Sequence, residues 1–220
     1  MKKILGSLLV LGFQFSFAQL SRDVGEFSSL KVYDKITVVI IPSNENKVES
    51  SSDDASVETV NKNGELKIRM SPAKILQGNQ VSVKVYYRNL NDIQASQGSS
   101  VSSSETWKAN MVSLTANEGS KVNVGVDTGK LTVKTNSGGE IVVTGTADYQ
   151  DIVVNSGGKF YGQNLDSKNA TITANAGGIA EVYATESVDA KTRAGGTIDV
   201  YGDPNDRKYK NVIGGKINFK

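Results

Sequence analysis

Tyrosines are the side chains in this sequence whose type and spacing best suit ligand binding. Tyr183 and Tyr201 each stand five residues past a Gly-Gly pair, and Tyr161 stands in the segment before them. A tyrosine offers an apolar ring with a polar tip, which suits stacking against a sugar ring. The alternative is an aromatic pair on neighbouring strands that only stabilises a sheet. We predict that Tyr161, Tyr183 and Tyr201 form a ligand-binding face.

The composition excludes several kinds of catalysis and metal binding. Among the 220 residues there is no His and no Cys. The chain therefore has no Ser-His-Asp triad, no imidazole base, no His-ligated or thiolate-ligated metal and no disulfide. The segment Asp203-Pro204-Asn205-Asp206 supplies two carboxylates, whereas calcium takes about six to eight oxygen ligands. We expect no metal site, no cofactor and no catalytic residue.

Residues 1–18 have the features of a cleaved signal peptide. Residues 2 and 3 are lysines, residues 4–17 carry no charge, and Ser16-Phe17-Ala18 places small residues at the −3 and −1 positions of a cleavage site. The apolar run is shorter than the roughly 20 residues of a membrane-spanning helix. We expect an exported protein without a transmembrane segment, located in the periplasm, at the outer cell surface or outside the cell.

The charge balance restricts the partners. The sequence has 25 Lys and Arg against 23 Asp and Glu, and removal of residues 1–18 takes away Lys2 and Lys3. The remaining chain is neutral, whereas nucleic acids and anionic membranes attract proteins with an excess of positive charge. We therefore expect neither as the main partner and favour cell-surface glycans or proteins.

A glycine pair recurs through the second half of the chain at intervals of 18 to 21 residues. Each pair is Gly-Gly or Gly-Ser, and the first members are Gly98, Gly119, Gly138, Gly157, Gly177, Gly195 and Gly214. Around each pair apolar and polar residues alternate, which is the period of a strand with one buried face. The apolar positions that follow the pairs are Val101, Val122, Ile141, Phe160, Ala180, Ile198 and Ile217.

This repeat predicts an all-β fold, a parallel β-helix (solenoid) of about seven regular coils of 18–21 residues. Successive coils would lie about 4.8 Å apart, so that equivalent side chains stack in columns. A β-sandwich of hairpins is the competing interpretation, and it predicts turn signals about every 8–12 residues.

Asparagine stands two residues before the glycine pair in four successive repeats. These residues are Asn117, Asn136, Asn155 and Asn175, and the same position holds Ser96 before them and Arg193 after them. Asn favours tight turns on its own. In a solenoid the four amides would also donate from coil to coil. We predict a structural amide ladder that Arg193 ends.

The N-terminal half is rich in strand-like runs but lacks the repeat. Asn63-Gly64 stands between two such runs and predicts a hairpin. An uncovered solenoid end exposes unpaired strand edges, so terminal units cap it. We predict that residues 19–92 form irregular, wider β coils that cap the regular repeats of 93–220 and belong to the same body. Two hypotheses apply to the other, open end: Lys216 and Lys220 protect the edge, or the edge pairs with a second copy and forms a homodimer.

The ordered motifs resemble those of a known family. They are Phe27-x-x-Leu30-x-Val32, Ile36-x-Val38, Gly64-x-Leu66-x-Ile68, Val81-x-Val83-x-Val85-Tyr86, Leu90-x-x-Ile93 and the Asn-x-Gly-Gly repeats. Over residues 24–218 the chain resembles the auto-transporter adhesin family with a head GIN domain, exported Bacteroidetes proteins of unknown function. The resemblance implies a right-handed single-stranded β-helix in the periplasm or at the cell surface. Many relatives are lipoproteins, but this chain lacks the Cys that would carry the lipid.

These observations together predict a non-enzymatic, adhesin-like module that binds glycans or proteins. One alternative is a polysaccharide lyase or hydrolase, since such enzymes also use β-helices. A glycosidase needs carboxylates that face each other across a cleft, and the predicted outward rows contain no cluster of acids. The other alternative is a purely structural, self-assembling element.

Overall fold

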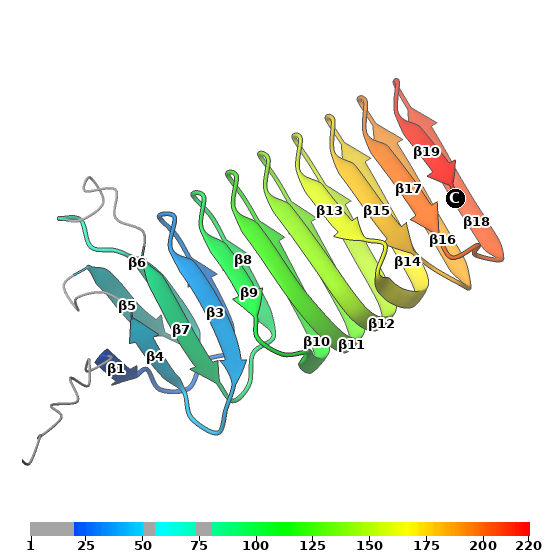
Figure 1. The fold of residues 1–220 in the computed structure, drawn as a ribbon. Helices are drawn as coiled ribbons and strands as arrows, with labels where there is room; N and C mark the ends of the chain where they lie inside the picture. The colour runs from blue at the N-terminus through cyan, green and yellow to red at the C-terminus, as the bar shows by residue number, and fades with distance from the viewer. Residues whose placement is uncertain (1–19, 51–55, 74–80) are drawn as a thin grey trace, which may run out of the picture.

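The computed structural model describes residues 20–50, 56–73 and 81–220, so the predicted signal peptide lies outside the described residues. The described chain consists of strands and turns, and its 19 strands are joined in one hydrogen-bonded arrangement. The strands stack as flattened coils into an elongated solenoid, with the tight turns along one edge (Figure 1). The predicted parallel β-solenoid is confirmed.

Strands β8 to β19 build the regular part of the stack. They are β8 (Asp92–Ala95), β9 (Ser100–Ser103), β10 (Trp107–Ala116), β11 (Lys121–Thr135), β12 (Glu140–Val154), β13 (Lys159–Gly162), β14 (Leu165–Asn175), β15 (Ile179–Tyr183), β16 (Ser187–Arg193), β17 (Thr197–Tyr201), β18 (Asp206–Val212) and β19 (Lys216–Phe219). The pairings between them are parallel. Strands β11 and β12 continue through a bend, so that one strand serves both faces of the stack.

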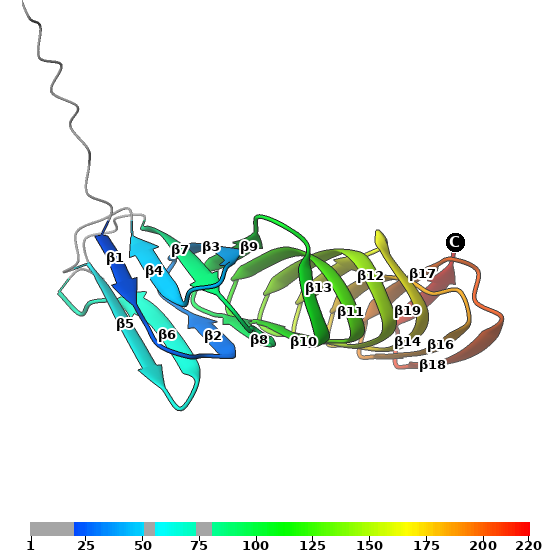
Figure 2. The same cartoon turned by 90° about the horizontal axis from the view of Figure 1, so that it is seen from below.

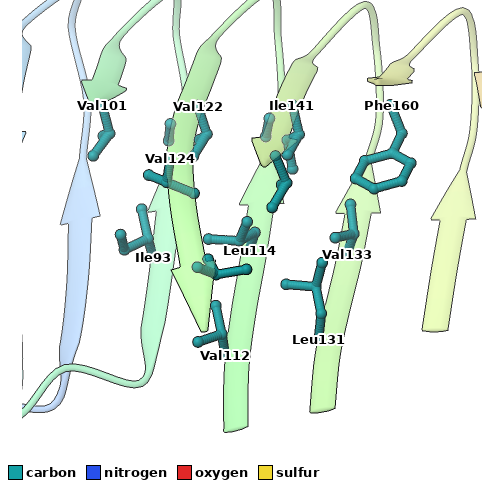
Figure 3. Packing of buried hydrophobic residues seen from close by; sticks show 14 of the residues in the cluster. Ile93, Val101, Val112, Leu114, Val122, Val124, Leu131, Val133, Ile141 and Phe160 are labelled. Atoms are coloured by element: carbon teal, nitrogen blue, oxygen red, sulfur yellow. The ribbon is translucent and has the colours of Figure 1, made fainter. Parts of the chain in front are cut away.

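The core is a set of apolar columns that run along the stack. Val122 pairs in register with Val101 on one side and with Ile141 on the other. Ile141 pairs in turn with Phe160, and all four side chains are buried inside the coils (Figure 3). The large ring of Phe160 fits because Gly162 has no side chain, since a Cβ there would lie 2.6 Å from the ring. Residues about one repeat apart in sequence are therefore neighbours in space, as predicted.

The two glycines of a pair serve different purposes. Ser137 and Gly138 have φ angles of 49° and 74°, and the Gly139 amide donates to the Asn136 carbonyl at 2.9 Å. Positive φ at both central residues is the mark of a type I′ turn, and glycine adopts it without strain. Gly139 is needed for another reason, because a Cβ at this position would overlap the carbonyl oxygen of Ala116 on the preceding coil.

The N-terminal strands continue the stack in an order that differs from the chain order. They are β1 (Leu20–Asp23), β2 (Ser29–Val32), β3 (Thr37–Pro42), β4 (Lys47–Ser50), β5 (Val57–Lys62), β6 (Glu65–Met70) and β7 (Ser82–Tyr87). Strand β2 pairs with β6 on one side and β8 on the other, and β3 pairs likewise with β7 and β9. The coil of β2 and β3 is thus inserted between the coil of β6 and β7 and the coil of β8 and β9.

Antiparallel strands cover the N-terminal end. Strands β5 and β6 form the hairpin predicted at Asn63-Gly64, and β4 pairs antiparallel with β1 and β7 (Figure 2). Within this region β3 keeps the regular register, with Val38 opposite Val101. An antiparallel strand can pair with the last coil without starting another one, which explains how the stack stops here.

The coil of β18 and β19 differs from the coil before it at its inward positions. Arg207 and Tyr209 stand opposite Val188 and Ala190. The Arg207 guanidinium lies 4.8 Å from the centroid of the Phe219 ring, and Tyr209 meets this ring edge-on at 5.8 Å. Partly polar side chains therefore occupy the last positions of the apolar columns.

Candidate functional site

A groove of about 830 Å³ runs along the bend of four successive coils, on the edge opposite the tight turns. Strands β10, β11, β12 and β14 pass through this bend, and their register places Lys108, Asp127, Thr146 and Asp166 side by side. We call this column the first wall. The second wall lies two residues further along the same strands and consists of Asn110, Gly129, Asp148 and Lys168. We call the whole feature the bend groove.

Small residues explain why the bend is hollow. The inward position between the two walls is Ala109, Thr128, Ala147 and Ser167 in successive coils. A few residues further on, the inward column contains Val112 and Leu131, whose larger side chains are buried in the core. Short side chains at the bend cannot fill the same volume, so the surface is indented there.

One end of the bend groove is closed by residues of the following coil. Tyr183, the last residue of β15, and Thr185 both line the groove. The Tyr183 ring lies over Gly202, where a Cβ would come within 3.1 Å of Tyr183 Cε1. Gly202 also has a φ of 90°, so glycine satisfies both the backbone and the ring. The groove therefore combines an aromatic end with two polar walls.

Two of the three carboxylates in the groove already have partners. Asp127 accepts a hydrogen bond from Thr146 at 3.1 Å and lies 3.9 Å from Lys108 Nζ. Asp148 pairs with Lys168 at 2.8 Å. Asp166 is exposed, and none of the hydrogen bonds or ion pairs found among the described residues involves its side chain. Its carboxylate is thus the acceptor in the groove that is most available to a ligand.

A buried polar cluster lies directly beneath the groove. Gln150 is fully buried, and its Nε2 donates to Ser167 Oγ at 2.6 Å and to the Tyr183 carbonyl at 2.8 Å. Ser167 Oγ donates to the same carbonyl at 2.6 Å. These bonds fix the backbone that carries the tyrosine. Gln150 Oε1 has no hydrogen-bond partner among the described residues, although it is buried.

The three tyrosines predicted as a ligand-binding face lie in different settings. Tyr183 and Tyr201 are register partners on β15 and β17. Tyr161 is not in their column, because it pairs with Val142 and with Glu181. All three rings are half-buried on the outward side of their strands, and only Tyr183 lines the groove. The groove itself was not predicted, because the small residues at 109, 128, 147 and 167 become a signal for it only once the position of the bend is known.

The tyrosine face also contains a pair of like charges. Glu181 stands opposite Asp199 on the next coil. Partial burial raises the pKa of the Glu181 carboxyl, and the negative charge of Asp199 raises it further. The negative charge of Asp199 is stabilised by two contacts. Its Oδ1 accepts a hydrogen bond from the Asn218 side-chain amide at 2.7 Å and lies 3.6 Å from Lys220 Nζ. This face is therefore less favourable for a negatively charged ligand.

The four asparagines lie one above the other at the tight turns. The side-chain amide of Asn136 donates to Asn117 Oδ1 at 2.8 Å, that of Asn155 to Asn136 at 3.0 Å, and that of Asn175 to Asn155 at 2.8 Å. Asn117 donates to Ser96 Oγ at 3.3 Å. At the far end Asn175 Oδ1 is buried next to Arg193, its register partner, and accepts no hydrogen bond from any residue that the structure describes.

The oxygen-rich segment near the C-terminus is a turn held by an arginine. Arg207 Nε donates to the Pro204 carbonyl at 2.9 Å, and its guanidinium pairs with Asp203. Across the described part of the chain, no group of three or more acidic residues is placed to hold a metal ion. Nor does a membrane-spanning helix occur anywhere in that part of the chain.

The fold and the groove define a β-solenoid with a polar groove at the bend of its coils. The family described as "Putative auto-transporter adhesin, head GIN domain" matches residues 26–204, and the chain belongs to this family. The resemblance seen in the sequence is confirmed. No curated protein matches the sequence.

Several solved structures share the fold at low sequence identity. A "putative adhesin" from Bacteroides fragilis NCTC 9343 is 17% identical, with a TM-score of 0.83 over 92% of this chain and 96% of that one. A "putative adhesin" from Parabacteroides distasonis ATCC 8503 is 19% identical, with a TM-score of 0.75 and the same coverage. A "putative lipid binding protein" from the same organism is also 19% identical, with a TM-score of 0.71 over 92% and 96% of the two chains.

Proposed function

We propose that this protein is an exported, non-enzymatic binding module of the adhesin type, and that its bend groove binds carbohydrate in the periplasm or at the outer cell surface. The observation that carries this proposal is the groove with Tyr183 at one end and carboxylates, lysines and hydroxyls along its walls. The adhesin names of the family and of the similar structures support a binding role.

The chemistry of the groove suits a sugar. Sugar rings offer hydroxyl groups around their edges and C–H groups on their faces. Asp166 and Asp148 accept hydrogen bonds from hydroxyls, and charge-assisted bonds of this kind are among the stronger ones. Tyr183 supplies an apolar ring with a polar tip for the sugar face.

Hydrolysis of the carbohydrate is the competing function, because Asp127 and Asp148 lie on opposite walls of the groove. Their side chains are 55% and 66% exposed, and each lies beside a lysine. A general acid in a glycosidase is instead a carboxyl group that apolar surroundings keep protonated. The groove therefore favours binding over catalysis.

A glycan array followed by calorimetry tests the proposal. We expect the wild-type protein to bind one class of glycan and Tyr183→Ala to lose at least tenfold in affinity. Tyr161→Ala and Tyr201→Ala are matched controls, since neither ring lines the groove. If the flat tyrosine face is the real site, these two variants will weaken binding as much as Tyr183→Ala does.

Two further assays separate the other functions. An increase in reducing ends after incubation with a bound polysaccharide would indicate a hydrolase. A pull-down with outer-membrane proteins that depends on Tyr183, without any hit on the array, would indicate a protein ligand.

A further inference from the structure

We infer that the ligand of the bend groove is a neutral, linear oligosaccharide chain that runs along the stack and contacts several coils at once. This inference rests on the proposed function. It narrows the ligand from carbohydrate in general to neutral linear chains, and it specifies that the chain lies parallel to the axis of the stack.

The direction follows from how the polar groups repeat. Lys108, Asp127 and Thr146 are register partners on adjacent strands, and Asp166 continues the column. Adjacent strands are about 4.8 Å apart, so the first wall presents a polar group at about this interval over four coils, roughly 14 Å in all. A chain of sugars repeats its hydroxyls from unit to unit and can therefore use this row. Perpendicular to the axis of the stack, the groove is only three residues wide, and on β10 these residues are Lys108, Ala109 and Asn110.

The charge of the walls explains the choice of a neutral chain. The groove contains three aspartates and two lysines, and both lysines already lie beside a carboxylate. No cation in the groove is left over for the regular negative charges of an acidic polysaccharide. Such a polymer would bring its charges close to Asp166, whose carboxylate has no partner among the described residues.

The two ends of the groove should contribute differently. At one end both Asp166 and Tyr183 line the groove, and the buried Gln150 donates from below to the Ser167 hydroxyl and to the Tyr183 carbonyl. At the other end the side chains of Lys108 and Asp127 are 77% and 55% exposed, and their charged atoms lie 3.9 Å apart. We assign the anchoring subsite to the Asp166 end and the extension subsites to the Lys108 end.

Calorimetry with three series of neutral linear sugars tests the inference: cello-, xylo- and manno-oligosaccharides of one to six units. We expect at least one series to bind, with an affinity that rises at least tenfold from one unit to four and then levels off. Asp166→Asn should weaken binding at every length. Lys108→Ala should weaken binding only of the longer chains, because a single sugar at the anchoring subsite does not reach it.

Other results would overturn the inference. Equal affinity for one unit and for four would show that the ligand does not extend along the stack. A loss with Lys108→Ala that is the same at every length would contradict the two subsites. If all three series fail while branched or acidic glycans bind on the array and depend on Tyr183, the inference is wrong and the proposed function stands. Thermal melts of both variants serve as the folding control, since both side chains are exposed.

Discussion

Asn155 donates its side-chain amide to Asn136 Oδ1 at 3.0 Å, although 19 positions separate them in sequence. This bond is one step of a ladder in which Asn136, Asn155 and Asn175 each donate the side-chain nitrogen to the oxygen of the asparagine one coil before. The ladder follows the tight turns, so it holds together the same edge of the stack where the chain reverses direction.

Asn136→Ala should lower the free energy of unfolding by about 1–3 kcal/mol, because it leaves Asn117 Oδ1 without a donor and Asn155 Nδ2 without an acceptor. Chemical denaturation followed by circular dichroism measures the change. Ser137→Ala is the matched control, since alanine already occupies the same turn position at Ala176 and Ala194. Equal losses in the two variants would contradict a stabilising role of the ladder.

Arg193→Asn should stabilise the protein by about 0.5–1.5 kcal/mol. Arg193 pairs in register with Asn175, whose buried Oδ1 has no partner in the described part of the chain, so an asparagine here would add one more donor to the ladder. Arg193→Ala removes the same exposed side chain without adding a donor. A gain that is as large in Arg193→Ala as in Arg193→Asn would show that the new hydrogen bond is not the cause.

Gly139→Ala and Gly138→Ala should differ sharply, although the two glycines are adjacent. A Cβ on Gly139 would overlap the Ala116 carbonyl oxygen of the neighbouring coil, and we expect a loss of about 2–4 kcal/mol. At Gly138 a Cβ meets no atom within 4 Å, and only the positive φ is unfavourable, which costs about 1–2 kcal/mol. Urea midpoints of the two variants measure the difference. The reverse order would refute the assignment of one glycine to the turn and the other to coil spacing.

The regular stack was predictable because each contact there recurs at a fixed interval. Val101, Val122 and Ile141 occupy the same position in successive repeats, so the register of one pair predicts the register of the next pair. The order of the N-terminal coils was not predictable in this way. Leu30 pairs with both Leu66 and Ile93, and nothing in the local sequence distinguishes these partners from other apolar residues.

The groove could not be predicted from the chemistry-bearing residues alone. Asp127 and Asp166 lie in the first wall, but Thr146 occupies the equivalent position on the strand between them, and Asp148 lies in the second wall. The aspartates therefore do not recur at one position of the repeat. The structural cause of the groove is instead the small inward residue at each bend. Such residues attract attention only after the position of the bend is known.

Glu181→Gln should raise the melting temperature at pH 7 by about 1–2 °C. The pKa of Glu181 is raised in the folded protein above its ordinary value of 4.5 by partial burial and by Asp199. The charged form is therefore less favourable in the folded state than in the unfolded state. This cost is fully present above the raised pKa and disappears as the pH falls below 4.5.

Melting curves from pH 7 to pH 4 test this prediction. The difference between Glu181→Gln and wild type should shrink toward zero as the carboxyl group becomes protonated. Asp189→Asn is the control, because Asp189 is exposed and stands opposite Thr171 and Lys208 instead of another acid. A difference that stays constant with pH would mean that the ionisation of Glu181 is not involved.

The homodimer through the C-terminal coil remains a prediction, and the structure indicates how it should respond to salt. Among the described residues nothing pairs with the outer edges of β18 and β19, and Tyr209 is 67% exposed there. Lys208, Lys210 and Lys216 lie on the same edges, so two copies would bring like charges together. Association should therefore strengthen between about 0.05 and 0.5 M NaCl, because salt screens this repulsion.

Sedimentation velocity over a range of concentrations measures the association. Tyr209→Lys should abolish it by adding charge at the exposed end. Met111→Lys is the matched control, because Met111 is also exposed, at 65%, but lies on β10 in the middle of the stack. A mass that stays monomeric at every concentration and salt would exclude this dimer. A dimer that Met111→Lys disrupts as strongly as Tyr209→Lys would place the interface on the side of the solenoid instead of its end.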